Sequence, residues 1–337
     1  MILVLAVAPA AALLCAVLIL AMRPLLRRYA LARPNARSSH REPTPQGGGI
    51  AVVGAALALV ALVLASGFAP QARSPALVVA GAALVLAALG AWDDLRPLSA
   101  RVRLLVQFGA VAAVLLAVPA RVLPGWPAWI EWPVLLVAGV WWVNLVNFMD
   151  GLDWLSVAET VPVTACLVAL GIVGPLPPLP TIAAASLLGA VLGFAPFNKP
   201  VAGLFLGDVG SLPLGLLTGW MLLELAAAGA LVAALILGLY YLADATLTLF
   251  RRLQRRERVW EAHRTHYYQR ATDNGFTPLE VSAQVFALNL ALAALAAAVA
   301  LSPAPLLQGV ALAGAAGLVA LVLRRFSTPR GARAERA

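Results

Sequence analysis

Two adjacent carboxylates, Asp93 and Asp94, directly follow an uncharged run that ends at Trp92. At the C-terminal end of a helix they repel each other and face the negative end of the helix dipole. A divalent cation, an arginine such as Arg101 or Arg103, or a neutral form of one carboxyl would each offset the repulsion. The pair indicates either a solvated helix end or a site of metal-assisted or acid–base chemistry.

A second polar group lies at 144–153, where two asparagines and two aspartates stand close together. Residues three apart drift by about −60° per step around a helix, so Asn144 and Asp153 cannot face one site from a single regular helix. We expect the helix to end near Gly151, which leaves Asp150 and Asp153 in a turn facing a nucleotide or an ion. One such Asn would indicate only an interhelical hydrogen bond, but four polar residues at membrane depth are typical of a functional site.

A third group, Gly207-Asp208-Val209-Gly210-Ser211, precedes another apolar run. Glycine allows a ligand to approach the backbone, and the start of a helix offers N–H groups and a positive dipole end to phosphate. Asp208 is a candidate Mg²⁺ ligand, because Mg²⁺ prefers one or two carboxylates together with phosphate oxygens. Combined with the two acidic groups, this motif predicts a phosphate-bearing substrate.

All three histidines, His40, His263 and His266, lie outside the apolar runs, and Arg264 stands between the last two. Arginine and histidine suit the recognition of a diphosphate. A zinc site is not expected, because no cysteine is near them and the carboxylates are committed elsewhere.

Membrane-spanning helices must position these groups. The 337 residues are 62% hydrophobic and 12% charged, whereas soluble proteins average about 45–50% and about 25%. A soluble domain is excluded, and the chain lacks the period-two alternation of a barrel. We therefore expect an all-α, polytopic integral membrane protein with about eleven transmembrane helices. Their expected ranges are 2–22, 50–67, 75–92, 104–119, 133–149, 156–174, 180–197, 211–226, 230–250, 282–301 and 306–323. Cys15 and Cys166 fall inside these ranges and are expected to pack as small apolar side chains.

The basic residues predict the orientation, since 22 of the 24 lie in alternate loops. The positive-inside rule then places the N-terminus outside and the C-terminus in the cytoplasm. We expect the first helix to be retained and the net charge of +9 to serve orientation and contact with anionic lipid, with no nucleic-acid partner. One transmembrane catalytic domain is expected at 1–323, followed by a basic cytoplasmic tail at 324–337. Its cytoplasmic active-site loops are 23–49, 93–103, 150–155, 198–210 and 251–281.

In order along the chain, these motifs resemble those of the polyprenyl-phosphate N-acetylhexosamine-1-phosphate transferases (glycosyltransferase family 4). That family includes phospho-N-acetylmuramoyl-pentapeptide transferase and the undecaprenyl-phosphate N-acetylglucosamine-1-phosphate transferases. The matching elements are Arg33-Pro34-Asn35, Ser39-His40, Pro43 to Gly49, Asp93-Asp94, Asn144 to Asp153, Phe197-Asn198, Gly207 to Ser211, and His263 to His266.

The resemblance implies that a lipid phosphate attacks the β-phosphate of a UDP-N-acetyl-hexosamine and releases UMP. Mg²⁺ is the implied cofactor, with Mn²⁺ as a substitute, and its implied ligands are Asp208 and Asn147. Asp93 and Asp94 match the pair that activates the lipid phosphate, and Phe205 matches the aromatic that stacks on uracil. The expected catalytic residues are Asp93, Asp94, Asp208, His263 and His266. The expected substrate-binding residues are Asn144, Asp150, Asp153, Asn198, Phe205, Arg101, Arg264 and His40.

The implied partners are a UDP-N-acetyl-hexosamine, undecaprenyl phosphate and membrane lipid, and a homodimer is compatible with the sequence. The implied location is the bacterial cytoplasmic membrane, with the active site on the cytoplasmic face. Two departures from the family pattern stand out. Trp154 and Ser156 replace a Gly and an Ala, and the histidine motif reads His-Arg-Thr-His-Tyr-Tyr-Gln. The second departure favours the branch that begins O-antigen or other surface polysaccharides on GlcNAc, QuiNAc or FucNAc over the peptidoglycan branch.

A transporter or flippase is the alternative from another class, because Glu159, Glu224 and Asp244 lie within apolar runs. Glu159 and Glu224 are expected close to opposite membrane boundaries, and Asp244 is interpreted as an interhelical hydrogen bond. A CDP-alcohol phosphatidyltransferase is disfavoured, because its Asp-Gly-x-x-Ala-Arg pattern does not follow Asp150-Gly151.

Overall fold

The computed structural model describes residues 2–32, 43–118, 121–123, 125–258, 263–302 and 304–330. Over these ranges the regular secondary structure is helical except for one short strand pair, in which β1 (Leu31–Ala32) pairs antiparallel with β2 (Thr44–Pro45). The helices are α1 (Ile2–Tyr29), α2 (Gly48–Ala65), η1 (Pro70–Ala72), α3 (Arg73–Leu95), α4 (Ala100–Ala117), α5 (Ala128–Met149), α6 (Leu155–Val173), α7 (Pro178–Phe194), α8 (Asp208–Leu225), η2 (Ala226–Ala230), α9 (Leu231–Leu237), α10 (Leu239–Gln254), α11 (Tyr267–Asp273), α12 (Pro278–Ala300) and α13 (Pro305–Phe326). The predicted helical class is confirmed.

By length and composition, nine helices of the described part could cross a membrane. The multi-pass membrane character is thus supported, while the count of eleven and the orientation stay predictions. Two features account for the difference in number. The apolar helix α7 has only 17 residues, and the long span Asp208–Leu237 contains both α8 and α9, with a break at Gly229 where φ is 91°.

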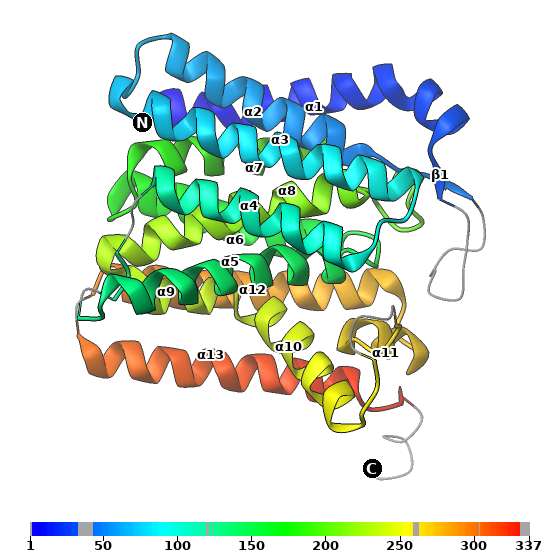
Figure 1. The fold of residues 1–337 in the computed structure, drawn as a ribbon. Helices are drawn as coiled ribbons and strands as arrows, with labels where there is room; N and C mark the ends of the chain where they lie inside the picture. Colours follow the sequence, from blue (N-terminus) through cyan, green and yellow to red (C-terminus); the bar gives the residue numbers. More distant parts are fainter. Residues whose placement is uncertain are drawn as a thin grey trace.

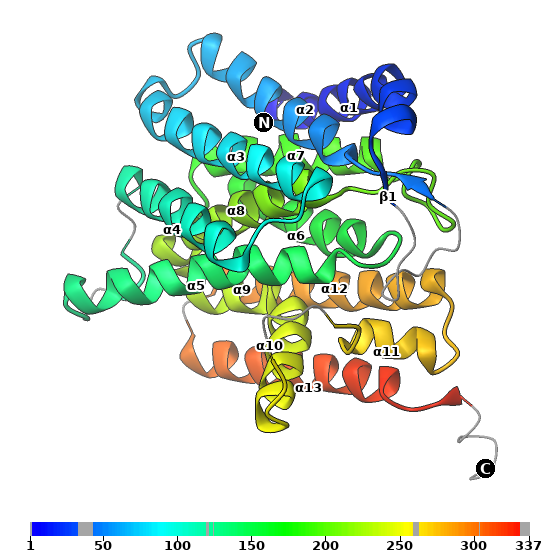
Figure 2. The same ribbon diagram turned by 45° about the vertical axis from the view of Figure 1, so that its right-hand side comes forward.

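The centre of the bundle is formed by α7 and α8, as Figures 1 and 2 show. Helix α7 packs against α1, α2 and α6, and α8 packs against α2, α3 and α5. Small residues allow this close packing. A Cβ on Gly189 of α7 would lie 2.0 Å from the carbonyl oxygen of Ala8 in α1. Cys15 and Cys166 are free and buried, as predicted.

One end of the bundle gathers the polar segments identified in the sequence. In Figure 1 the strand pair, the loop from α3 to α4, and α11 all lie at the right-hand end. Helix α10 is separated from α9 at Gly238 and runs obliquely to its neighbours in both views. The polar segment predicted at 251–281 therefore contains the end of α10, all of α11 and the start of α12.

Candidate active site

The start of α8 is held by Asp94 from the last turn of α3. Gly207 precedes the helix with φ of 76°, a left-handed backbone that favours glycine. The backbone N–H groups of Asp208 and Val209 donate to the two carboxylate oxygens of Asp94 at 3.0 and 3.1 Å. A carboxylate at a helix N-terminus is stabilised by the free N–H groups and the dipole. The N–H groups at this helix start were expected to bind a phosphate, but two of them donate to Asp94 instead.

Three helices approach one another very closely at this point. A Cβ on Gly90 of α3 would lie 2.1 Å from the carbonyl oxygen of Asp208, and one on Gly49 of α2 would lie 2.1 Å from the Cα of Gly210. The backbone N–H groups of Gly48 and Gly49 also donate to the carbonyls before α8, both at 2.9 Å. The Pro43 to Gly49 motif thus packs α2 against the start of α8.

A chain of hydrogen bonds joins α3, α4, α5 and α8 beside Asp94. One carboxylate oxygen of Asp93 accepts from the Arg103 guanidinium at 2.9 Å. The other Arg103 nitrogen donates to the Asn147 carbonyl oxygen at 3.2 Å. Asn147 then donates to an oxygen of Asp208 at 2.7 Å and to the hydroxyl of Ser211 at 2.8 Å.

We call Asp93, Asp94, Arg103, Asn147 and Asp208 the acidic cluster. Asp208 interacts with the carboxyl of Asp93 and with the charges of Asp94 and Arg103. Arg103 therefore offsets the charge of two of the three carboxyls, Asp93 and Asp208. Among the residues that the structure describes, no three His, Cys, Asp or Glu side chains form a metal site by themselves. The donor set nevertheless fits Mg²⁺, which is often bound through one or two carboxylates and completes its shell with water and substrate phosphate.

Asp150 lies next to this cluster, in the turn after α5. The turn begins where the sequence predicted it, since α5 ends at Met149. The Ser156 hydroxyl donates to Asp150 at 2.5 Å. Burial, together with the negative charges of Asp208, Asp94 and Asp153, raises the pKa of Asp150 to about 8 against the lowering effect of the Ser156 hydrogen bond. At pH 7 this carboxyl is therefore largely neutral.

Asp153 and Asn198, both expected to bind substrate, hold two loops together. A carboxylate oxygen of Asp153 accepts from the backbone N–H of Ala202 at 3.0 Å. The Asn198 side chain accepts from the backbone N–H of Trp154 at 2.8 Å and donates to the Leu204 carbonyl at 3.0 Å. Both side chains are buried. Their observed contacts shape the loop between α7 and α8.

Trp154 occupies the position where the family pattern has glycine. Its φ of 63° is left-handed, which explains the preference for glycine there. Its indole N–H donates to the carbonyl of Ala195 at 2.6 Å. Trp154 thus joins the start of α6 to the end of α7 in addition to filling the turn.

Two other expected substrate-binding residues, Asn144 and Arg101, are not among the side chains of the acidic cluster. Asn144 is buried and donates to Gln107 at 2.6 Å and to the Val140 carbonyl at 2.8 Å, so it joins α5 to α4. Arg101 is exposed, whereas Arg103 enters the cluster. His40 lies outside the described residues. Phe205 is half-buried and lies next to the loop that leads to Asp208.

The second polar region is the histidine segment, His263 to Tyr268. The rings of His263 and His266 stack with centroids 4.9 Å apart, and His266 also stacks on Tyr268 at 5.7 Å. The Tyr268 hydroxyl donates to the Phe148 carbonyl at 3.0 Å and lies 2.1 Å from where a Cβ on Gly151 would be. The segment is therefore in contact with the turn that carries Asp150.

Arg264 is anchored by α11, where it contacts Thr272 at 3.0 Å and Asp273 at 3.3 Å. Its buried Nε makes no hydrogen bond to any residue that the structure describes. A further donor is therefore available in this half-buried guanidinium.

The fully buried Asp244 of α10 lies beneath the histidine segment. One of its oxygens accepts from the backbone N–H of Tyr267 at 2.9 Å, and the other accepts from that of Tyr268 at 3.1 Å. The Nδ1 atom of His266 lies 3.2 Å from the first oxygen. Sequence reasoning treated Asp244 as an interhelical hydrogen bond and carried Arg101 forward in place of Arg103. Depth in an apolar run was the only signal for Asp244, and the start of α4 decides which arginine faces Asp93.

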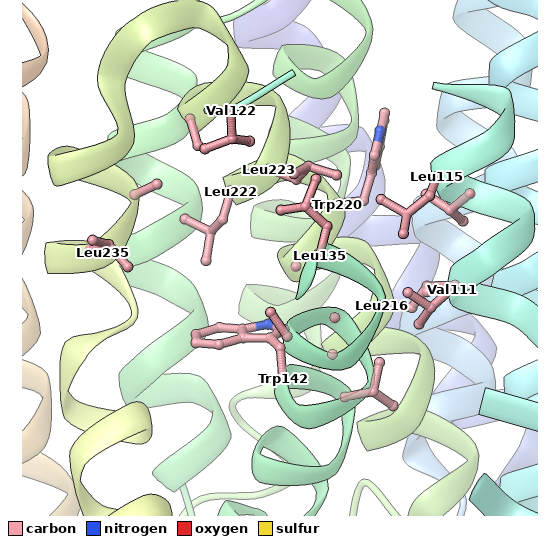
Figure 3. A pocket seen from close by; sticks show the side chains of 18 of the residues that line it. Val111, Leu115, Val122, Leu135, Trp142, Leu216, Trp220, Leu222, Leu223 and Leu235 are labelled. Carbon is pink, nitrogen blue, oxygen red and sulfur yellow. The ribbon is translucent and has the colours of Figure 1, made fainter. Parts of the chain in front are cut away.

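An apolar pocket of about 220 Å³ lies among α4, α5, α8 and α9 (Figure 3). All the side chains that line it are apolar, and Trp142 and Trp220 are the largest of them. The Trp142 indole is oriented by a hydrogen bond to Thr218 at 3.0 Å. Three of the helices that form this pocket also carry Arg103, Asn147 and Asp208.

Comparison with known families gives one match. The family model described as glycosyl transferase family 4 matches residues 76–226. No curated protein matches the chain. The matched residues cover a little less than half of the chain and include the whole acidic cluster, whereas the histidine segment lies outside them. The match supports a relationship between this part of the chain and the sugar-phosphate transferases of that family.

Proposed function

We propose that the protein transfers an N-acetylhexosamine-1-phosphate from its UDP-sugar to undecaprenyl phosphate, releasing UMP. The observation that carries the proposal is the acidic cluster, in which Asp93, Arg103, Asn147 and Asp208 from four helices are joined at one end of a helical membrane bundle. Such a group of carboxylates and a guanidinium suits the handling of phosphates.

In this reaction an oxygen of the lipid phosphate bonds to the β-phosphorus of the UDP-sugar. The bond from that phosphorus to the bridging oxygen breaks, and UMP departs with the oxygen and its electron pair. Phosphoryl transfer depends chiefly on positioning and charge neutralisation. We assign positioning of a phosphate to Arg103, which reaches both Asp93 and Asn147. Asp94 keeps the start of α8 in place through the N–H groups it accepts.

We propose Asp208 and Asp93 as the residues that hold Mg²⁺, with Asn147 beside them. The ion would supply neutralisation of the phosphate charge. Without a cation, the interacting carboxyls of Asp93 and Asp208 depend on the Arg103 guanidinium to offset their charge. Mn²⁺ has the same charge and accepts the same oxygen ligands.

The apolar pocket among α4, α5, α8 and α9 is a candidate site for part of the polyprenyl chain. Its position on the helices of the acidic cluster would let the phosphate of the lipid reach Arg103 while the chain remains in an apolar environment. On the nucleotide side, the Nε–H of Arg264 is a candidate donor for the diphosphate, and the stacked rings of His263 and His266 carry nitrogens that could contact the sugar.

We further propose that the donor is UDP-GlcNAc or a related UDP-QuiNAc or UDP-FucNAc, as the first membrane step of O-antigen or other surface-polysaccharide synthesis. The His263-Arg264-Thr265-His266 sequence supports this branch over the transferase of peptidoglycan synthesis. We place the reaction at the cytoplasmic face of a bacterial cytoplasmic membrane, because the acidic cluster and the histidine segment are at the end of the bundle that carries the basic loops.

A transport function finds little support in the contacts of the intramembrane acids. Glu159 accepts from Asn289 at 2.6 Å, Glu224 accepts from the Trp220 indole at 3.2 Å, and Asp244 accepts from backbone N–H groups of the histidine segment. Each acid is thus engaged in a local contact between or within helices.

The test is UMP release by the purified protein in detergent with undecaprenyl phosphate and Mg²⁺, across parallel UDP-N-acetyl-hexosamines, including the UDP-N-acetylmuramoyl-pentapeptide. We expect release that requires the lipid phosphate and stops with EDTA. Asp208→Asn should abolish it, while Glu280→Gln is the matched control, because its carboxylate lies on the exposed start of α12. No UMP from any donor, with the protein folded, would refute the proposal.

A further inference from the structure

Asp244 is the least expected side chain near the candidate site. It is fully buried, yet five donors surround it, and none of them is a lysine or an arginine. Besides the backbone N–H groups of Tyr267 and Tyr268, the hydroxyls of Thr248 and Tyr240 lie 3.4 Å from its oxygens. A buried carboxylate is costly unless hydrogen bonds satisfy it. Here the hydrogen bonds come mainly from the segment that carries His266.

The fifth donor is Nδ1 of His266, and its contact with Asp244 determines which ring nitrogen carries the proton. We propose that Asp244 is a positioning residue that holds His266 with its proton on Nδ1 and directs Nε2 away from α10. A carboxylate accepts but does not donate, so the ring nitrogen 3.2 Å from its oxygen must carry the proton. Stacking of His266 on His263 and Tyr268 then restrains the plane of the ring.

One other group competes for the His266 side chain. The backbone N–H of Gln269 also faces it, in the capping box at the start of α11. Accepting that N–H would favour the opposite tautomer. The carboxylate contact should prevail, because hydrogen bonds to an ionised partner are roughly twice as strong as those between neutral groups.

The consequence for chemistry rests on the proposed function. When a buried carboxylate holds the Nδ1–H of a histidine, it fixes the tautomer, and the ring then presents one defined nitrogen, Nε2, to a ligand. The histidine segment contacts the turn of Asp150 through Tyr268 and Gly151. We infer that Nε2 of His266, which carries no proton in this state, accepts a hydrogen bond from a hydroxyl or N–H group of the donor's sugar, and that Asp244 affects turnover only through His266.

The direct test is the side-chain ¹⁵N spectrum of the ¹⁵N-histidine-labelled protein in lipid nanodiscs. The chain has three histidines, so His266→Gln assigns the signals of His266. At a pH where the ring is neutral, we expect the protonated nitrogen to be Nδ1. A wild-type spectrum with the proton on Nε2 would overturn the proposal without any variant.

Asp244→Asn supplies the second test. The amide places an N–H₂ against one of the donors now satisfied by the carboxylate, so the Nδ1–H form should no longer dominate and kcat for UMP release should fall about 10²-fold. Asp244→Glu should restore part of the wild-type spectrum. The matched control is Glu224→Gln, another carboxylate within the bundle, which should leave the His266 signals unchanged.

The outcomes separate this inference from the proposed function. An unchanged His266 tautomer in a folded Asp244→Asn protein would refute the positioning role. If Asp244→Asn does not fold, the wild-type spectrum still decides. Absence of UMP release by the wild-type protein would refute the transferase, whereas the spectrum would still report whether Asp244 controls His266.

Discussion

The acidic cluster and the histidine segment are both polar regions at one end of an apolar bundle, but they are held in different ways. In the acidic cluster, side chains from four helices contact one another, and Asp94 accepts N–H groups from the first turn of a long helix. In the histidine segment, His266 and the backbone N–H groups of Tyr267 and Tyr268 converge on the buried carboxylate of Asp244, and the Tyr268 hydroxyl adds a hydrogen bond to Phe148. Side chains from four helices hold the first region together, whereas one carboxylate receives three contacts in the second.

This difference predicts which substitutions separate activity from stability. A side chain in the acidic cluster that faces the reaction can be changed while the surrounding helices keep their packing. A change at Asp244 should also shift the groups of the histidine segment that contact it. The largest loss of activity should come from a substitution in the acidic cluster.

Asp208→Asn should lower kcat for UMP release by about 10³-fold or more, because it removes a charge proposed to face phosphate and metal. Its melting temperature should stay close to that of the wild type, since the backbone N–H of Asp208 still donates to Asp94. Steady-state kinetics measures the expected loss of turnover, and thermal unfolding measures the expected melting temperature. A variant with near-normal turnover would remove Asp208 from the reaction.

Asp94→Asn, by contrast, should chiefly lower the stability of the fold. An amide leaves only one acceptor for the two N–H groups at the start of α8, and an unsatisfied buried group costs about 1–3 kcal/mol. We expect a lower melting temperature than for Asp93→Asn, which keeps that helix end intact. Equal stability of the two variants would contradict the distinction between these neighbours.

Arg103→Lys should reduce kcat/KM by about 10- to 100-fold. Lysine keeps the charge but cannot reach Asp93 and Asn147 with two nitrogens, and hydrogen bonds to charged groups are worth about 1.5–3 kcal/mol. Arg101→Lys is the matched control, because Arg101 is exposed on the same helix. Equal losses in both variants would argue against a specific role of Arg103.

Asp150 predicts a pH dependence. Its pKa is raised to about 8 by burial and by the nearby carboxylates, so it is mainly neutral at pH 7 and gains a negative charge as the pH rises above 8. One added charge near an anionic donor, at about 1 kcal/mol, should raise the KM for UDP-sugar about fivefold between pH 7 and 9. In Asp150→Asn this rise should disappear. A rise that persists in the variant would assign it to another group.

The smallest effect is expected for Trp154→Gly. Glycine relieves a left-handed backbone that costs other residues about 1–2 kcal/mol, but it loses the indole hydrogen bond to Ala195. We expect the melting temperature to change by only a few degrees. A collapse of stability would show that the indole is the main link between α6 and α7.

Much of this arrangement could be predicted from the sequence. Uncharged runs predicted most helix positions, and the break after Met149 was expected from the spacing of Asn144, Asn147 and Asp150. Asp93, Asp94 and Asp208 were identified because carboxylates beside apolar runs are costly unless they serve a purpose. These three carboxylates lie within residues 76–226, the range that the family model matches, and their roles stay predictions.

The remainder depended on tertiary contacts that spacing cannot reveal. Asn144 meets Gln107 only because α4 and α5 pack together, and Asp153 accepts from Ala202 only because the α7–α8 loop folds back. The role of Asp244 required α10 to run beneath the histidine segment. Which polar groups are satisfied by the protein and which are left for a ligand is decided by the fold.

The protein is proposed to break the bond between the β-phosphorus and the bridging oxygen of the UDP-sugar. A UDP-N-acetyl-hexosamine labelled with ³²P at the β-phosphate shows which bond breaks. With undecaprenyl phosphate and Mg²⁺, we expect the label to move into the organic phase with the lipid while unlabelled UMP stays in water. Label that remains in the aqueous phase as UDP, with the sugar on the lipid, or label that never leaves the donor, would refute the proposed reaction.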